Sequence, residues 1–263
     1  MAPQTAGPGP RARYREQTRA EIKDAALRQL AEGGTPALAL VKIAKELGLS
    51  GPALYRYFAG RDDLLDALIG DAYADLAAAM AAVPSAAEAG EAVVGPAADS
   101  PAGAAAGSPA ASARSPRAQL RALVRAFRAW AVEQPHRYLL IAGTPVPGYE
   151  APQETRAHAR AALGPLVAAL TDAAPGPVLD PVVADMRAWI DDEPSVVAWL
   201  DAYVPDADPQ AAAVALAGAV HVWSQLHGTV SLEVSGLFQG MGHDPATLLA
   251  AQADLLADAL GLP

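Results

Sequence analysis

Three side chains of one short segment, Ala53, Arg56 and Tyr57, share the outer face of an expected helix. Leu54 and Phe58 fall on the opposite face and predict the side that packs inward. An outer face with a guanidinium and a phenol offers positive charge and hydrogen-bond donors, and a helix that projects such a face fits the major groove of DNA. The chemistry that these residues predict is therefore recognition of a polyanion.

The sequence lacks the arrangements of Cys, His and Ser residues that catalysis and metal binding require. The chain has no cysteine, which excludes a cysteine nucleophile, a thiolate-bound metal and a disulfide. None of its five histidines has another histidine four residues later, and none lies in an HExxH pattern, so a metal site has no support. Ser224 and His227 are one helical turn apart, but no nucleophile elbow surrounds the serine, and glycine-rich phosphate loops are absent. We expect neither an enzyme nor a cofactor.

Charge is distributed unevenly along the 263 residues. Residues 11–61 carry ten Lys and Arg against five Asp and Glu, a net charge of +5, while the rest of the chain carries −15. This asymmetry predicts that one end meets a polyanion and that the remainder avoids one. A solvated, arginine-rich helix surface is the alternative explanation.

The elements that position the basic face are expected to be short helices. A first helix is expected from about Glu16 to Ala31, ending at Gly33 and Gly34, and a second over residues 40–47, ended by Gly48. Ser50 is suited to cap a third helix, and a fourth is expected from near Gly60. Two short helices joined at a tight turn form a helix-turn-helix. Further helices are expected around residues 120–131, 135–142, 153–173, 209–238 and 245–260. A rigid proline-rich corner is expected at TPVPGYEAP (144–152) and a proline-broken acidic region at 174–208. Since no segment shows sustained strand alternation, the fold class is predicted to be all-α.

The segment GLSGPALYRYFAGRDDLLDAL resembles the N-terminal motif of the tetracycline-repressor (TetR) family of bacterial transcription regulators. Tyrosine hydroxyls and helix-start amides donate to phosphate oxygens, and an arginine can bind guanine in bidentate fashion. The phosphate contacts that the resemblance implies are Tyr55, Tyr57 and Arg61. Packing between helices is the alternative role for the two tyrosines. The full set of residues implied to bind or approach double-stranded DNA is Lys42, Ser50, Pro52, Ala53, Tyr55, Arg56, Tyr57 and Arg61.

Some positions depart from the family's pattern. Ala39 stands where Ser or Thr usually caps the second helix, and Gly60 replaces a capping serine. Val41 and Gly51 offer no side-chain hydrogen bond to a base. We therefore expect few direct base contacts, with additional phosphate or minor-groove contacts from the arginines at the start of the chain. These are Arg11, Arg13 and Arg15.

The segment WSQLHGTVSLEVSGLF resembles the C-terminal domain of a TetR subgroup named for its Trp, His and Gly motif, here Trp223, His227 and Gly228. Independently, apolar residues recur at spacings of four and three, as in a coiled-coil seam. Two such helices per chain predict a four-helix interface in a homodimer, which would place two DNA-reading helices about 34–36 Å apart on a palindromic operator. The expected interface residues are Leu216, Val220, Val230, Val234, Leu237, Leu248, Gln252 and Leu255.

The resemblance also implies a small-molecule effector whose binding releases the operator and so relieves repression. An effector does this only if it binds the released conformation more tightly. Core packing is the alternative role for the aromatic candidates, and a hydrogen-bonded interface position is the alternative for His227. The acidic run at residues 191–193 either attracts a cationic compound or is solvated surface. The expected pocket residues are Trp130, Tyr138, Met186, Trp189, Trp223 and His227.

The sequence also predicts the location of the protein and its domain ranges. The N-terminal residues lack the apolar core of a secretory signal, so we expect a cytoplasmic protein. The uncharged run at 209–232 contains polar residues, among them Gln210, His221, Ser224, Gln225 and His227, so we expect no membrane segment. A helical scaffold or small-molecule-binding protein without DNA binding is the alternative function. The expected ranges are a disordered tail (1–10), a helix-turn-helix domain (11–60), a connecting helix (61–82), a low-complexity flexible loop (83–116) and a regulatory and dimerisation domain (117–263).

Overall fold

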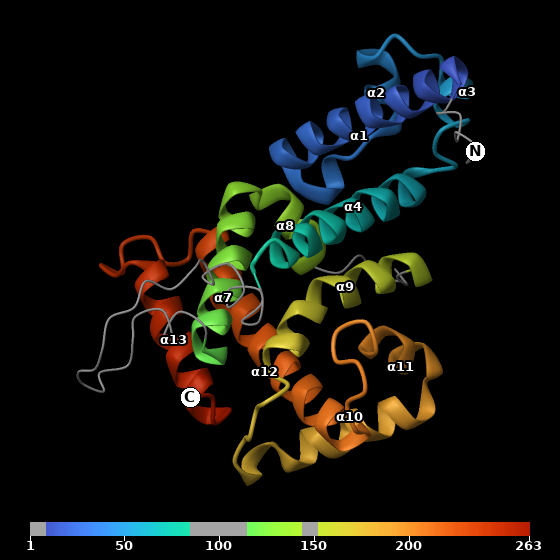
Figure 1. Ribbon diagram of the computed structural model, residues 1–263. Helices are drawn as coiled ribbons and strands as arrows, with labels where there is room; N and C mark the ends of the chain where they lie inside the picture. Colours follow the sequence, from blue (N-terminus) through green and yellow to red (C-terminus); the bar gives the residue numbers. More distant parts are fainter. Residues whose placement is uncertain (1–8, 85–114, 144–151) are drawn as a thin grey trace, which may run out of the picture. The chain divides into compact units, whose positions relative to one another are not determined.

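The structure, a computed structural model, describes residues 9–84, 115–143 and 152–263. These residues form helices joined by turns, with no strand among them, which confirms the predicted all-α class (Figure 1). Three predictions fall wholly or mainly on residues that are not described: the disordered tail, the flexible loop at 83–116 and a proline-rich corner at TPVPGYEAP (144–152).

The described residues divide into two compact units. The N-terminal unit contains the described residues up to Ala72 together with those between His136 and Thr155. The C-terminal unit contains those from Tyr73 to Pro135 and from Arg156 to Pro263. The division therefore falls inside the expected connecting helix, and the short helix after Pro135 groups with the N-terminal unit instead of the regulatory domain.

The N-terminal unit is built from α1, α2, α3, the first half of α4, and α8. Their bounds are Pro10–Ala37, Leu40–Glu46, Gly51–Leu54, Arg61–Ala81 and Pro135–Ala142. The second, third and fourth helices start where the sequence predicts. Their core contains Ile22, Ala26, Leu30, Ile43, Leu54, Phe58, Leu64 and Leu68, each 6% exposed or less.

Helix α1 is longer than expected because it begins at Pro10 rather than near Glu16. Proline suits the first helical position since its missing N–H has no partner there in any case. The helix loses helical geometry at Gly33 and Gly34, where it was expected to end, and Gly34 has φ +64°. The left-handed backbone at that position favours glycine, and a last turn follows it as far as Ala37.

The turn between α2 and α3 has the geometry that its sequence predicts. Gly48 has φ +65°, a left-handed conformation that costs glycine little. The Leu49 N–H then donates to the Ala44 carbonyl at 2.8 Å, which satisfies a carbonyl at the end of α2. The turn therefore closes tightly and starts α3 only five residues after α2 ends.

The C-terminal unit contains α7 (Pro116–Glu133), most of α9 (Gln153–Ala169), η1 (Pro177–Leu179), α10 (Asp180–Asp192), α11 (Pro194–Leu200), α12 (Pro209–Val234) and α13 (Pro245–Ala259), together with the end of α4. Helix α12 packs against α7, α10 and α13. The helices expected around 120–131, 153–173, 209–238 and 245–260 are all present, with shorter C-terminal ends in α9 and α12.

Residues 174–208 were expected to be a proline-broken acidic region, and this expectation is wrong. The segment contains η1, α10 and α11. Its prolines at 177, 181 and 194 lie at the first or second position of these elements, where proline begins a helix rather than breaking it.

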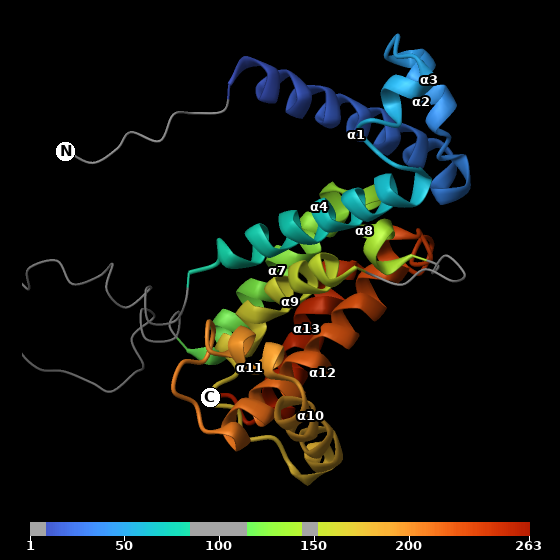
Figure 2. The same ribbon diagram turned by 90° about the vertical axis from the view of Figure 1, so that its right-hand side faces the viewer.

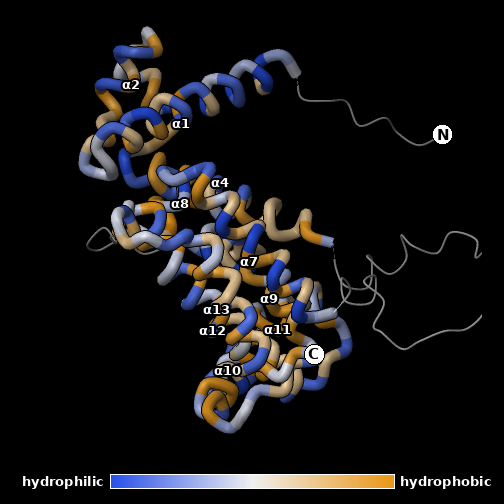
Figure 3. The backbone as a smooth tube through the Cα atoms, turned by 90° about the vertical axis from the view of Figure 1, so that its left-hand side faces the viewer, coloured by the Kyte–Doolittle hydropathy of each residue, from blue (hydrophilic) through white to orange (hydrophobic). Residues whose placement is uncertain are grey.

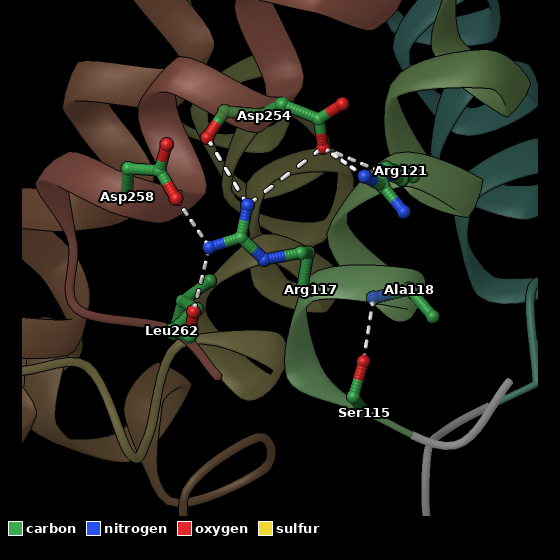
Figure 4. A network of polar contacts seen from close by, with 7 residues as sticks. All are labelled: Ser115, Arg117, Ala118, Arg121, Asp254, Asp258 and Leu262. Atoms are coloured by element: carbon green, nitrogen blue, oxygen red, sulfur yellow. Dashed lines mark hydrogen bonds and ion pairs between the residues drawn. The ribbon is translucent and has the colours of Figure 1, made fainter. Parts of the chain in front are cut away.

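Helices α7 and α13 are joined by arginine–carboxylate contacts (Figure 4). Arg117 Nη2 lies 2.5 Å from an Asp258 carboxylate oxygen and also donates to the Leu262 carbonyl at 3.0 Å. Arg121 Nε donates to Asp254 at 2.5 Å. These contacts fix α7 along α13 at the end of the unit that carries the C-terminus.

Within the part of the chain that the structure describes, no helix is both long enough and apolar enough to cross a membrane. The uncharged run at 209–232 lies in α12, where Leu216, Leu226 and Val230 are buried in the core of the C-terminal unit. The run is therefore accounted for by packing of this helix.

Candidate nucleic-acid interface

The central feature is the segment Ser50–Phe58, which we call the reading segment. Only Gly51–Leu54 is α-helical, so the helix is shorter than predicted. The Ser50 hydroxyl oxygen accepts the Ala53 N–H at 3.3 Å, which confirms its predicted role as N-cap. After Leu54 the chain turns, and the Tyr57 N–H donates to the Leu54 carbonyl at 2.8 Å. This segment is one helical turn followed by a tight turn.

Two buried side chains anchor the reading segment. Leu54 and Phe58 are each 1% exposed within the core of the N-terminal unit, as predicted. Pro52, Tyr55 and Arg56 are exposed, and Tyr55 is 55% exposed. The segment therefore presents a phenol and a guanidinium outward.

The remaining predicted DNA contacts differ in exposure. Lys42 on α2 is exposed, and Ala53 is half-buried. Tyr57 is half-buried and packs against the core of the N-terminal unit, as the packing alternative expects for this residue. The exposed candidates are thus Lys42, Tyr55 and Arg56, with Ser50 and Pro52 at the start of the segment.

Arg61 has a different role from the predicted phosphate contact. Its Nη2 donates to the Thr35 carbonyl at 2.6 Å and its Nε to the Leu38 carbonyl at 3.3 Å. These carbonyls belong to the end of α1 and the residue after it, so Arg61 ties the start of α4 to that end. We remove Arg61 from the expected phosphate contacts, because its donors hold the base of the helix-turn-helix.

Side chains of the N-terminal unit bind backbone N–H groups beside the two missing caps. The Ala39 N–H donates to the Gln29 side-chain oxygen at 2.9 Å, which joins α1 to the start of α2, although α2 has no side-chain cap. The Ala59 N–H donates to the Asp63 carboxylate at 2.7 Å at the start of α4. An acid early in the fourth helix was a usable signal for Asp63, whereas nothing in the local sequence indicates Gln29.

Another residue that the sequence did not indicate, Arg19 of α1, contacts the end of the reading segment. Its Nη1 donates to the Tyr57 carbonyl at 2.5 Å, and its guanidinium carbon lies 4.2 Å from the centre of the Phe58 ring. The partners are 38 residues apart in sequence for the hydrogen bond, so no local pattern indicates the contact.

The basic start of the chain is helical. Arg11, Arg13 and Arg15 are exposed on the first turns of α1, and Tyr14 beside them is 68% exposed. Figure 2 shows these turns extending beyond α2 and α3, and Figure 3 shows hydrophilic positions recurring along the helix. The arginines are therefore carried on a rigid element and not on an extended arm.

The candidate effector residues lie in two different units. Tyr138 is fully buried in the N-terminal unit, whereas the other five belong to the C-terminal unit. Trp223 and His227 lie together on α12, with ring centres 4.7 Å apart. Phe127 of α7, which was not predicted, lies edge-on to both, at 5.5 Å from Trp223 and 5.1 Å from His227. The structure thus brings together Phe127, Trp223 and His227, which we call the aromatic cluster.

Other aromatic candidates have separate environments. Trp130 is 6% exposed on α7, and Met186 and Trp189 are half-buried on α10. The Arg160 guanidinium of α9 lies 5.5 Å from the centre of the Trp189 ring. Trp189 therefore takes part in a cation–π contact between helices.

Burial lowers the pKa of His227 from its ordinary value of 6.5 to about 4. The cause is loss of solvation, which disfavours the imidazolium form. The ring is therefore neutral near pH 7. Ser224, one turn earlier, donates to the His221 carbonyl at 2.8 Å and not to His227, so this pair forms no catalytic arrangement.

The predicted dimer seam requires revision. Leu216 and Val230 are 0% exposed in the single chain, because α12 is covered by α7, α10 and α13 on the sides that these residues face. Gln252 of α13 is half-buried, and its side-chain oxygen accepts the Thr229 hydroxyl at 2.6 Å. Leu237 and Leu255 are 60% and 67% exposed, while Val220, Val234 and Leu248 are half-buried. We remove Leu216 and Val230 from the proposed interface.

Among the residues at 9–84, 115–143 and 152–263, no group of three or more His, Asp or Glu side chains is placed to hold a metal ion. The arrangement in the N-terminal unit instead offers exposed donors and positive charge on a tightly anchored segment. Such a surface binds phosphates and the edges of bases.

The comparisons with known proteins cover both units. Residues 22–68 match a model of bacterial regulatory proteins of the tetR family, and residues 120–256 match a model of a tetracyclin repressor-like C-terminal domain. The HTH-type transcriptional regulators Rv1816 of Mycobacterium tuberculosis (strain ATCC 25618 / H37Rv) and Mb1846 of Mycobacterium bovis (strain ATCC BAA-935 / AF2122/97) are each 38% identical over 154 residues. That alignment covers 59% of this chain and 56% of each relative, slightly more than half of their length.

Solved structures extend the similarity to nearly the whole chain. The crystal structure of the protein SCO4313 is 39% identical, covers 95% of this chain and 100% of its own, and has a TM-score of 0.68. The fatty acid degradation regulator FadR from Bacillus halodurans shares the fold, with 15% identity, coverage of 90% and 96%, and a TM-score of 0.51.

Proposed function

Because this chain belongs to the TetR family of bacterial regulatory proteins and is a helix-turn-helix transcriptional regulator, we propose that it acts as a dimeric repressor. In this proposal the reading segment binds a palindromic operator in double-stranded DNA. A small molecule bound in the C-terminal unit releases the operator.

The anchored reading segment is the observation that carries the proposal. Leu54 and Phe58 hold it in the core, and the exposed Arg56 can then donate two N–H groups of its guanidinium to O6 and N7 of a guanine. The Tyr55 hydroxyl and Lys42 suit phosphate oxygens on either side, since both are exposed donors. Arg11, Arg13 and Arg15 add positive charge to the same unit.

Exposed leucines on α12, on the turn that follows it and on α13 support a homodimer. Leu232 is 40%, Leu237 is 60% and Leu255 is 67% exposed, which is unusual for large apolar side chains in so small a region of a chain. A two-fold axis would bury this surface against its own copy. Two reading segments one DNA turn apart, about 34–36 Å, then match a palindrome.

The aromatic cluster supports an apolar or aromatic effector. Phe127, Trp223 and His227 present ring faces and edges to one another, and the imidazole is neutral near pH 7, so an anionic ligand gains no ion pair from it. A ligand inserted among these rings would separate α7 from α12. It releases DNA only if that separated state binds operator less tightly.

The DNA-binding part is tested with duplexes that the purified full chain enriches from random-sequence DNA. We expect Arg56→Ala to weaken binding to the enriched duplex by about 1–3 kcal/mol, or roughly five- to 150-fold, and to relax the preference at one base pair per half-site. Tyr55→Phe, which removes only the hydroxyl, is expected to lose less.

The matched control for this experiment is Arg125→Ala. Arg125 is an exposed arginine on α7, in the C-terminal unit, so its replacement removes the same charge away from the reading segment. Unchanged affinity in Arg56→Ala and in Tyr55→Phe would refute the proposed DNA surface.

A further inference from the structure

We propose that Arg19 is a positioning residue that holds the reading segment in its DNA-binding conformation without itself contacting DNA. This inference rests on the proposed function, since it concerns how the DNA-reading surface is held. It assigns a role to a residue of α1 that lies outside the helix-turn-helix.

Two contacts of different kinds join Arg19 to the end of the reading segment. Its Nη1 donates to the Tyr57 carbonyl at 2.5 Å, and its guanidinium carbon lies 4.2 Å from the centre of the Phe58 ring. A planar guanidinium can stack flat on a ring and donate in its own plane at the same time, whereas a lysine ammonium is a compact charge with no plane to stack on the ring. Because Phe58 is 1% exposed, the platform beneath Arg19 is fixed.

The reading segment needs such a support because it is too short to hold itself. Its α-helix ends at Leu54, and Tyr55, Arg56 and Tyr57 lie in the turn that follows. A single helical turn has little stability of its own. The exposed side chains of Tyr55 and Arg56 therefore take their direction from whatever fixes the turn after them, and Arg19 contacts that turn at Tyr57.

Arg61 joins the two ends of the segment that contains α2 and α3. It donates to the Thr35 and Leu38 carbonyls, which precede α2, from the first residue of α4. Because Arg61 joins the two ends of residues 39–60, the motion left to the reading segment is a tilt relative to α1. Arg19 is placed to restrict this tilt, since it joins α1 to Tyr57 and Phe58.

The acceptors of Arg19 are a carbonyl and an aromatic ring, which carry no net charge. Its positive charge therefore still adds to the potential around the N-terminal unit. Arg19→Lys keeps this charge and loses the planar geometry, so it separates positioning from attraction. Arg125→Lys, the same change at an exposed arginine of α7 that has no place in the proposed DNA surface, is the matched control.

The experiment compares binding of the full chain and its variants to an enriched duplex and to a scrambled duplex, over a series of salt concentrations. We expect Arg19→Lys to lower the ratio of specific to non-specific affinity by about tenfold or more, because base contacts need the correct direction of Arg56. Non-specific affinity and the salt slope stay unchanged, since the number of phosphate contacts is the same. Arg125→Lys leaves the ratio within about twofold.

Thermal unfolding and hydrogen exchange accompany the binding data. We expect faster exchange at the amides of Tyr57 and Phe58 in Arg19→Lys, with the unfolding midpoint little changed. If this variant does not fold, Arg19→Gln, which keeps a donor for the Tyr57 carbonyl, is measured in the same way and is expected to lose specificity too, because it lacks the cation over Phe58.

Three results would overturn the inference. An unchanged ratio of affinities together with unchanged exchange means that Arg19 does not position the segment. A uniform loss of affinity for both duplexes, with a salt slope smaller by about one in Arg19→Gln, means that Arg19 contacts a phosphate. A lower unfolding midpoint with an unchanged ratio means that it is only structural. If the unaltered chain enriches no sequence at all, the proposed function fails instead, and the two failures are distinguishable.

Discussion

The two units of this chain use arginine in different ways. In the N-terminal unit, Arg19 and Arg61 donate to backbone carbonyls that carry no net charge. In the C-terminal unit, Arg117 and Arg128 pair with the carboxylates of Asp258 and Glu233. Arginine therefore holds helices in place in both units. Arg19 does so through a carbonyl and a ring, whereas Arg61 also lies 3.9 Å from the Asp62 carboxylate.

This difference has a consequence for function. Residues 11–61 carry a net charge of +5 and the remainder carries −15. Arg19, whose partners carry no net charge, thus also adds to the potential that attracts DNA. In the C-terminal unit Arg117, Arg121 and Arg128 pair with carboxylates, and the excess acid of that unit repels a polyanion.

The largest effect is expected from the cores on which the two units depend. Phe58 and Phe127 are 1% and 0% exposed, and replacing either with alanine leaves a cavity that costs about 3–5 kcal/mol. If the units are as separate as their cores, Phe58→Ala speeds hydrogen exchange in the N-terminal unit and Phe127→Ala does so in the C-terminal unit. Equal loss of protection in both units from either substitution would show that the two cores do not unfold separately.

Acid should destabilise the C-terminal unit through His227. Its pKa is about 4 in the folded chain and near 6.5 when exposed, so the unfolded state binds the proton more readily. The stability lost as pH falls from about 6.5 to about 4 is expected to approach 3 kcal/mol, with no contribution above that range. Urea unfolding of the chain and of His227→Asn at several pH values measures it; identical pH dependence in both would contradict the effect.

The two kinds of arginine contact are compared by matched substitutions. Arg128→Met leaves the Glu233 carboxylate, whose side chain is 14% exposed, without its bidentate partner, and we expect a loss of about 2–3 kcal/mol. Arg61→Met leaves the Thr35 and Leu38 carbonyls without this donor, and we expect a loss of stability of about 1–2 kcal/mol. Salt should weaken only the first contact. Urea midpoints at low and high salt provide the measurement, and a reversed order of losses would break the comparison.

The smallest expected effect concerns the surface of the C-terminal unit. Leu255→Asp places a charge on the proposed dimer face, and we expect dimerisation to weaken by about tenfold, or 1.4 kcal/mol. Val178→Asp is the control, because Val178 is 82% exposed on η1, away from α12 and α13. Sedimentation over a range of concentrations measures both; an unaltered dimer in Leu255→Asp would remove this face from the account.

Local sequence patterns predicted much of the N-terminal unit. Gly48, Ser50 and the inward pair Leu54 and Phe58 each act within a few residues, so the turn, the cap and the buried face follow from short-range rules. The contact of Arg19 with Tyr57 joins residues 38 positions apart, which no local rule reaches.

The C-terminal unit was harder to predict because its helices are covered on several sides. A heptad spacing on α12 indicates an apolar seam but not which neighbour covers it, and Leu216 and Val230 turn out to face the unit's own core. The helices α10 and α11 were missed because their prolines start helices instead of ending them. Phe127 joins the aromatic cluster only through the packing of α7 on α12.

Methylation interference on an enriched duplex tests most directly whether the reading segment lies in the major groove, because N7 of guanine is exposed there. The account predicts one guanine per half-site whose methylation blocks binding of the unaltered chain. The same methylation is expected to have no further effect on Arg56→Ala. Interference at no guanine, or an identical pattern in Arg56→Ala, would contradict the account.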